Sequence, residues 1–152
     1  MHVEKLDHYS VRTADLDRAI QFYADALGFW AGPRPPSQTP GAWLYTRSPA
    51  GEAAGHPVVH LIGVNASAGR TSSEQAQDHH LPTGRTGAVD HIAFAASGAA
   101  DMRARLTRHG IAFRERTALN MPLHQMFMED PDGVMIELNY SRPEDIGSAT
   151  AL

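Results

Sequence analysis

The sequence of 152 residues contains no cysteine. Disulfide bonds and thiolate–metal sites are therefore excluded, and any metal ion must be held by nitrogen and oxygen ligands. The formal net charge is only −4, and neither basic nor acidic residues form long runs. A nucleic-acid-binding surface is not expected, because it needs a concentrated basic patch. No apolar run reaches membrane-spanning length and no basic start precedes an apolar stretch, so we expect a cytoplasmic protein without a membrane partner.

Apolar residues make up 42% of the chain, which is enough to bury the core of one domain of usual size. The chain also contains nine histidines and no His-tag run. Because cysteine is absent, the placement of these histidines decides whether a metal site can form.

The two halves of the chain repeat one another. The triplet Leu6-Asp7-His8 matches Val89-Asp90-His91, and each lies in an apolar stretch of strand length. An amphipathic helix follows each stretch and ends before a glycine, and short strand patterns follow each helix. In the first half we expect a strand at 6–11, a helix at 15–27 and strands at 28–31, 42–46 and 58–64. In the second half we expect a strand at 89–95, a helix at 99–109 and strands at 111–115, 123–128 and 134–140.

This order predicts a single α+β domain built from two tandem βαβββ modules. The first module covers about 3–64 and the second about 88–140, joined by a polar linker at 65–87 and followed by a polar tail at 141–152. Residues 130–133 have the composition of a tight hairpin turn, and residues 48–51 are its weaker counterpart.

Ligand-type residues occupy equivalent strands of the two modules. Strand residues two apart share a face, so His8 in the first strand of module 1 pairs with His60 in its last strand. In module 2, His91 pairs with Glu137 in the same way. If the two sheets curl toward each other, all four side chains converge on one ion. Three imidazoles and one carboxylate suit Fe(II), Ni, Zn, Co or Mn.

The chain resembles the vicinal-oxygen-chelate superfamily, which includes glyoxalase I, fosfomycin resistance proteins, extradiol dioxygenases and bleomycin-binding proteins. The matching segments are LDHYSV, DLDRAIQFYADALGF, VVHLIGV, VDHIAF and MEDPDGVMIELNY. The resemblance implies that the strands form a curved mixed sheet around a metal-binding cleft. It also implies a homodimer, a small-molecule substrate and one divalent metal ion held by His8, His60, His91 and Glu137. By position, Arg12 matches an arginine that grips the glutathione carboxylate in glyoxalase I. His60 replaces the usual glutamate of that enzyme.

The number of protein ligands on the ion distinguishes the possible reactions. With four protein ligands an octahedral ion keeps two open sites, which favours proton abstraction next to a carbonyl by an isomerase or lyase. The resemblance to glyoxalase I implies that Glu137 detaches and acts as the catalytic base. With only His8, His91 and Glu137, three sites remain, as in an Fe(II) extradiol dioxygenase. A binding or resistance protein without catalysis is the third option.

Substrate-binding residues are expected on the central strands. Trp43 and Tyr45 suit an aromatic-walled pocket. His124 and Tyr45 are an acid–base pair for the dioxygenase alternative. Gln125 stands where fosfomycin resistance proteins bind phosphonate, and we include it with Arg12 among the candidates.

Overall fold

The computed structural model describes residue 2 and residues 5–37, 39–47, 53–64, 89–117 and 122–146. The chain divides into two compact units, Met1–Thr83 and Gly84–Leu152. The expected linker at 65–87, the turn at 48–51 and residues 147–152 of the tail lie outside the described residues. Among the described residues, no helix has the length and apolar character needed to cross a bilayer.

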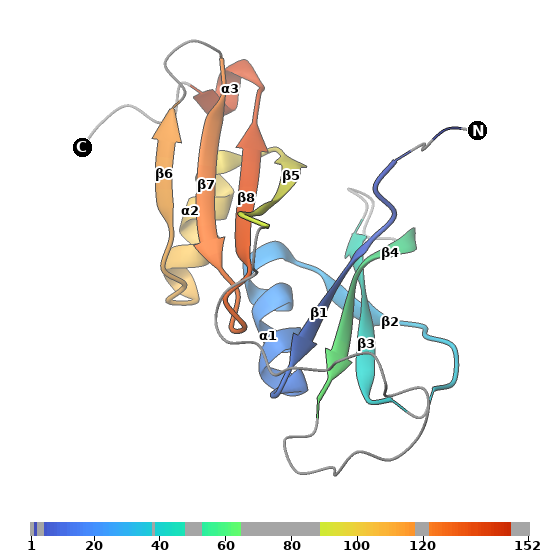
Figure 1. Ribbon diagram of the computed structural model, residues 1–152. Helices are drawn as coiled ribbons and strands as arrows, with labels where there is room; N and C mark the ends of the chain where they lie inside the picture. Colours follow the sequence, from blue (N-terminus) through green and yellow to red (C-terminus); the bar gives the residue numbers. More distant parts are fainter. Residues whose placement is uncertain are drawn as a thin grey trace. The chain divides into compact units, whose positions relative to one another are not determined.

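The first unit is a four-stranded mixed sheet with one helix (Figure 1). Its elements are β1 (Tyr9–Thr13), α1 (Leu16–Leu27), β2 (Trp30–Gly32), β3 (Gly41–Arg47) and β4 (Ala53–Gly63). The strand order is β1-β4-β3-β2. The first and last strands pair in parallel, whereas β3 pairs antiparallel with both β2 and β4.

The second unit repeats this topology. Its elements are β5 (Ile92–Ala96), α2 (Ala99–Arg108), β6 (Arg114–Thr117), β7 (His124–Glu129), β8 (Met135–Tyr140) and α3 (Pro143–Ile146). The order β5-β8-β7-β6 has the same parallel pair of first and last strands. The predicted α+β class and the two βαβββ modules are therefore confirmed, with one four-stranded sheet in each module.

Each unit has an apolar core on one face of its sheet. In the first unit, strand residues on one face and the inner face of α1 are almost fully buried: Val11, Tyr23, Leu44, Val59 and Leu61. In the second unit the corresponding set is Leu106, Met126, Ile136, Leu138 and Tyr140. Each such side chain contributes about 1.5–3 kcal/mol relative to full exposure. The alternation of the strands then places the candidate ligands on the opposite face.

The two helices begin with different caps. Asp15 caps α1 with its own side chain, which accepts a hydrogen bond from the Arg18 backbone N–H at 3.0 Å. Gly98 precedes α2 and has no side chain to do so. Asp145 of α3 provides the missing cap, because Asp145 Oδ1 accepts hydrogen bonds from the backbone N–H groups of Gly98 and Ala99 at 2.9 and 2.7 Å. The short helix α3, which the sequence analysis placed in a plain tail, therefore completes α2.

The predicted turn at 130–133 is present and connects β7 to β8. Asp130 Oδ1 accepts hydrogen bonds from the backbone N–H groups of Asp132 and Val134 at 2.9 and 2.8 Å. Gly133 has a φ of 83°, a conformation that residues with a Cβ rarely adopt. This turn fixes the register of the hairpin, in which Phe127 faces Glu137.

Candidate metal centre

The first unit brings His8 and His60 into direct contact. Their rings are stacked, with centroids 3.8 Å apart and planes 24° apart. The Trp43 ring also stacks on His60, with centroids 4.4 Å apart and nearly parallel planes. Trp43 of β3 and His60 of β4 are paired across the two strands, which is why their rings meet. Thus His60 takes part in two ring stacks, with His8 and with Trp43.

The environment of His60 favours a neutral imidazole. Its Nε2 is buried and has no hydrogen-bond partner among the described residues. Burial lowers the pKa of His60, and the nearby His8 lowers it further. A neutral ring with an unused nitrogen has the lone pair that metal coordination requires. His60 stands where glyoxalase I has a glutamate, and its unpartnered Nε2 is the structural feature that supports it as a ligand.

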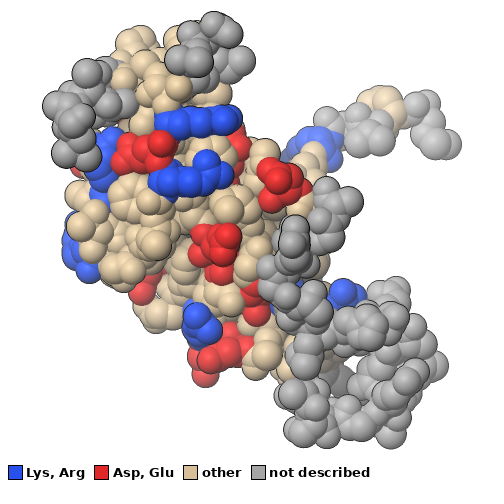
Figure 2. Space-filling view, turned by 60° about the vertical axis from the view of Figure 1, so that its left-hand side comes forward, with Lys and Arg blue, Asp and Glu red and all other residues tan. Residues whose placement is uncertain are grey.

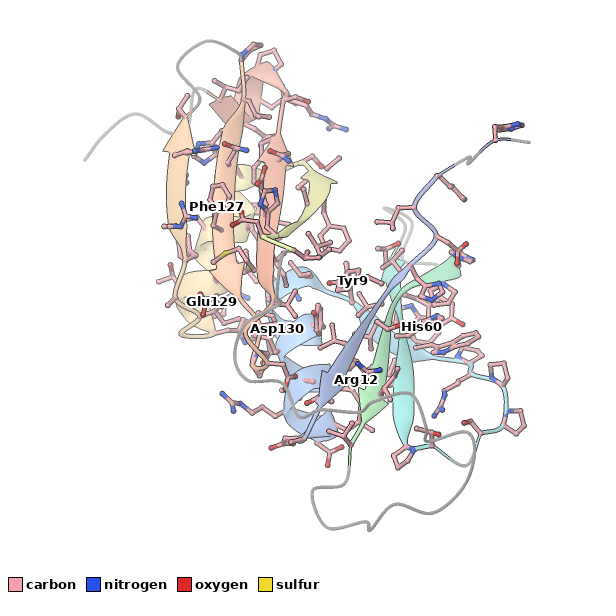
Figure 3. All side chains as sticks on the ribbon, in the orientation of Figure 1. Tyr9, Arg12, His60, Phe127, Glu129 and Asp130 are labelled. Carbon is pink, nitrogen blue, oxygen red and sulfur yellow. The ribbon has the colours of Figure 1, made fainter. Side chains whose placement is uncertain are left out.

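Arg12 and Tyr45 also belong to the first unit. Arg12 lies on β1 opposite Ile62, two residues along the strand from the Ser10–His60 pair, so it shares the face of His60 (Figure 3). Tyr45 is buried, and its hydroxyl donates a hydrogen bond of 2.6 Å to the carbonyl oxygen of Pro33. This bond occupies the hydroxyl proton of Tyr45, the atom that an acid–base role would use.

The second unit brings His91 and Glu137 together. His91 Nε2 lies 3.0 Å from Glu137 Oε2. Two ligand atoms in adjacent positions around an ion, with bonds of about 2.1 Å, are separated by about 3 Å. The donor atoms of His91 and Glu137 therefore already have the spacing of adjacent metal ligands. The Glu137 side chain is only 7% exposed, so its carboxylate needs a cation or proton donors nearby.

A chain of hydrogen bonds holds the other oxygen of Glu137. Gln125 Nε2 donates to Glu137 Oε1 at 2.5 Å and to Asn139 Oδ1 at 3.0 Å. Gln125 Oε1 accepts a hydrogen bond of 2.7 Å from Arg116 Nε. Arginine can only donate, so Arg116 dictates which end of the Gln125 amide faces Glu137. Gln125 thus holds one carboxylate oxygen and leaves the other directed at His91.

His124 lies on the opposite face of this sheet. It precedes Gln125 on β7, so the alternation of the strand turns its ring away from Glu137. The His124 ring is buried, and its Nε2 lies 2.8 Å from Glu115 Oε2. Glu115 also binds Arg103 of α2. The structure therefore places His124 in a polar cluster beneath α2, in contrast to the expected place beside the substrate.

The sequence analysis missed one shared feature of the two modules. Asp7 Oδ2 lies 2.7 Å from His8 Nδ1, and Asp90 Oδ2 lies 2.8 Å from His91 Nδ1. Both histidines also stand one residue before their strands, β1 and β5, and not within them as predicted. The repeated Asp-His pair was visible in the sequence and is the signal that could have revealed these contacts.

The residues present fit a divalent cation by their chemistry. Each unit offers one pair of donors, and no described group of three or more His, Asp or Glu side chains is close enough to hold an ion. The four-ligand set predicted from the sequence combines the two pairs. The role of His8, His60, His91 and Glu137 as ligands stays a prediction.

Comparison with known proteins places the chain in a family. Residues 5–138 match the model of the Glyoxalase/Bleomycin resistance protein/Dioxygenase superfamily. A curated relative, Glyoxylase I 4 of Arabidopsis thaliana, is 27% identical over 142 residues, which cover 91% of this chain and 71% of the relative.

Solved structures share the fold at low sequence identity. A putative glyoxalase family protein from Bacillus anthracis has a TM-score of 0.64 at 20% identity, over 93% of this chain and 98% of that one. A mutant of the fosfomycin resistance protein FosX from Listeria monocytogenes has a TM-score of 0.59 at 15% identity, over 95% of this chain and 97% of that one. That FosX structure was solved with Mn(II) and a dihydroxypropylphosphonic acid.

Proposed function

Because the chain belongs to the Glyoxalase/Bleomycin resistance protein/Dioxygenase superfamily, we propose that it is a metal-dependent enzyme of the glyoxalase or epimerase type. It would bind two adjacent oxygens of a small carbonyl substrate and act as an isomerase or lyase. The ligands would be His8, His60, His91 and Glu137, acting on one divalent ion. The observation that carries the proposal is the 3.0 Å separation of His91 Nε2 and Glu137 Oε2 on a sheet face whose repeat-equivalent positions hold His8 and His60.

In this reaction the ion would stabilise the negative charge that develops on the chelated oxygens. The chain's own residues supply the proton transfer. Glu137 is the only buried carboxylate described on this face, and Gln125 fixes its Oε1. Its Oε2 would detach from the ion and would then take a proton from the carbon next to the carbonyl. The buried setting of Glu137 limits access of water to that carbon.

The alternative is an Fe(II) extradiol dioxygenase, and one observation favours it. The His60 ring stacks with Trp43 as well as with His8, and the contact with Trp43 is a packing role for His60 that needs no metal ion. If His60 serves only in this packing, the ligands are His8, His91 and Glu137 alone, and the third open site admits dioxygen.

Metal analysis of protein purified without oxygen tests the proposal. The wild type should retain close to one divalent ion per chain. The variants His91→Ala and Glu137→Ala should each lose it, and His60→Ala should bind it more weakly. The matched controls are His109→Ala and Glu129→Ala, both exposed positions of the second unit. Full metal occupancy in both His91→Ala and Glu137→Ala would contradict the ligand assignment.

Activity then separates the two reactions. An isomerase or lyase works without oxygen and with Ni, Co, Zn or Mn. A dioxygenase requires Fe(II) and consumes oxygen with catechols. Protein that retains the ion and converts neither class of substrate would point to binding without catalysis.

We also propose a homodimer, and mixed dimers show which chains build the site. His8→Ala carries a defect in the first unit and His91→Ala carries one in the second. If each site draws on two chains, a mixed dimer of these variants contains one intact site and regains half of the metal. If each site lies within one chain, the mixed dimer stays empty.

A further inference from the structure

The face of the second sheet that carries Glu137 continues to a pair of arginines on β6. Strand pairing arranges the side chains of this face in two rows across the sheet. One row runs from Ala93 through Glu137 and Phe127 to Arg114, and the parallel row is Ala95, Asn139, Gln125 and Arg116. Adjacent strands are about 4.8 Å apart. Arg114 therefore starts about 10 Å from Glu137, two strands away in the same row.

Both arginines converge on one aromatic ring. The Cζ atom of Arg114 lies 4.1 Å from the centre of the Phe127 ring, and that of Arg116 lies 5.4 Å from it. Phe127 projects from β7 on this face (Figure 3). A ring holds a guanidinium in place through its electron-rich face, but it does not neutralise the charge. The two positive charges therefore lie close together, and the Phe127 ring offsets them only in part.

No carboxylate among the described residues pairs with Arg114 or Arg116. Their neighbour on β6 differs, since Glu115 points to the other face and binds Arg103 through two hydrogen bonds of 2.7 Å. Figure 2 shows that both basic and acidic side chains of the described residues lie on the face drawn there. Arg114 and Arg116 are exposed, so the two charges are open to a ligand.

We propose that Arg114 and Arg116 bind a carboxylate group of the substrate, so that the enzyme acts on a carboxylated molecule that also offers two adjacent oxygens. This inference rests on the proposed function, because the adjacent oxygens would lie at Glu137 and His91. The guanidinium groups recognise the planar carboxylate, and Phe127 keeps them in position. Gln125 connects the arginine pair to the proposed metal ligand, because it contacts both Arg116 and Glu137. The substrate class is therefore a small acid long enough to reach from β8 to β6.

A matched pair of probes isolates the contribution of the carboxylate. The probe 3,4-dihydroxybenzoate and its methyl ester have the same ring and the same vicinal oxygens, and only the acid is charged. Binding of each to the Zn(II)-loaded full chain is measured by calorimetry without oxygen. We expect the acid to bind about tenfold more tightly than the ester, because each exposed charge pair contributes at most about fivefold. This preference should fall as the salt concentration rises.

Substitution of the arginines tests their role. Arg114→Met and Arg116→Met should each reduce the preference about threefold, and the double variant should bind acid and ester alike. Arg108→Met, at an exposed position of α2, removes the same charge elsewhere and should leave the preference unchanged. The ester is an internal control, since a variant that disturbs Glu137 would weaken both probes.

The outcomes separate this inference from the proposed function. If the chain fails to retain Zn(II), the proposed function fails. The inference is then judged on metal-free protein, where 3,4-dihydroxybenzoate should still shift the side-chain Nε–Hε NMR signals of Arg114 and Arg116. If Zn(II) is retained and both probes bind equally to the wild type, the carboxylate role is wrong and the metal site stands. An undiminished preference for the acid in the double variant would also overturn the inference.

Discussion

The carboxylate of Asp90 lies 2.8 Å from Nδ1 of His91, on the side of the ring opposite the nitrogen that faces Glu137. The first module repeats this contact between Asp7 and His8 at 2.7 Å. A histidine that donates Nδ1–H to a carboxylate keeps the lone pair of Nε2 for a metal ion. The contact with His8 also keeps the pKa of Asp7 below its usual value. Both modules therefore contain the predicted ligand together with an aspartate that contacts its Nδ1.

Removing either support should weaken metal binding. Asp90→Ala and Asp7→Ala should each raise the dissociation constant for Zn(II) about tenfold, because the imidazole loses its fixed tautomer and orientation. Asp90→Asn should recover part of the affinity, since an amide oxygen still accepts the Nδ1–H. Competition with a chromophoric chelator measures the constants, with Glu129→Gln as the control. An unchanged constant in both alanine variants would contradict this role.

The bond from Gln125 to Glu137 should contribute to stability as well as to the site. In Gln125→Leu, Oε1 of the buried Glu137 loses its donor and Arg116 loses its acceptor. An unsatisfied buried charged group costs about 1–3 kcal/mol, and we expect a loss of that size in the free energy of unfolding. Urea unfolding of the metal-free protein measures it. Phe127→Leu, on the same strand and face, is the control for the change of packing. A loss in Gln125→Leu no larger than that in the control would show that the bond contributes little.

The sequence was sufficient to predict the duplicated fold because periodicity and turn residues act locally. The first helix was predicted at 15–27 and is found at Leu16–Leu27, and the hairpin turn was predicted at 130–133, where the structure has it. The pairs His8–His60 and His91–Glu137 followed from equivalent positions in two modules, and each pair is adjacent in the structure. Repetition thus carried information that a single module would not have given.

The features that the sequence did not reveal depend on tertiary contacts. The face on which His124 lies follows from where β7 begins, and a shift of one residue reverses it. Helix α3 is only four residues long and has no periodic signal, and Asp145 gains its role through contact with residues far away in the chain. The convergence of Arg114 and Arg116 on Phe127 required the pairing of β6 with β7. None of these three features can be predicted from a short stretch of the sequence alone.

The cap that Asp145 provides should be measurable as stability. Asp145 is buried, and its Oδ1 accepts two backbone hydrogen bonds at the start of α2. Loss of a capping side chain costs about 0.5–2 kcal/mol, and we expect Asp145→Ala to destabilise the protein by about that amount. Asp145→Asn retains an acceptor and should lose less. Glu144→Ala, at the exposed neighbouring position, is the control and should unfold at nearly the same urea concentration as the wild type. An Asp145→Ala midpoint equal to that of Glu144→Ala would show that α2 does not depend on the cap.

Stability at acid pH should depend on Glu115. The hydrogen bonds from Arg103 hold the pKa of Glu115 below its usual value, against the opposing effect of burial, and the charges of Arg103 and His124 lower it further. A carboxylate with a lowered pKa in the folded state contributes stability that is fully present above its unfolded pKa, about 4.3. This contribution is lost as the pH falls from that value through the folded pKa.

Glu115→Gln removes this titration and should therefore flatten the acid side of the stability profile. At pH 7 we expect the variant to be less stable by about 1–2 kcal/mol, because the bidentate contact with Arg103 loses its charge. The difference should shrink between about pH 5 and pH 3, where the wild-type carboxylate becomes protonated. Urea midpoints of the wild type, Glu115→Gln and the exposed-site control Glu129→Gln across this range measure the effect. Parallel profiles for the wild type and Glu115→Gln would show that the Arg103–Glu115 pair does not set acid stability.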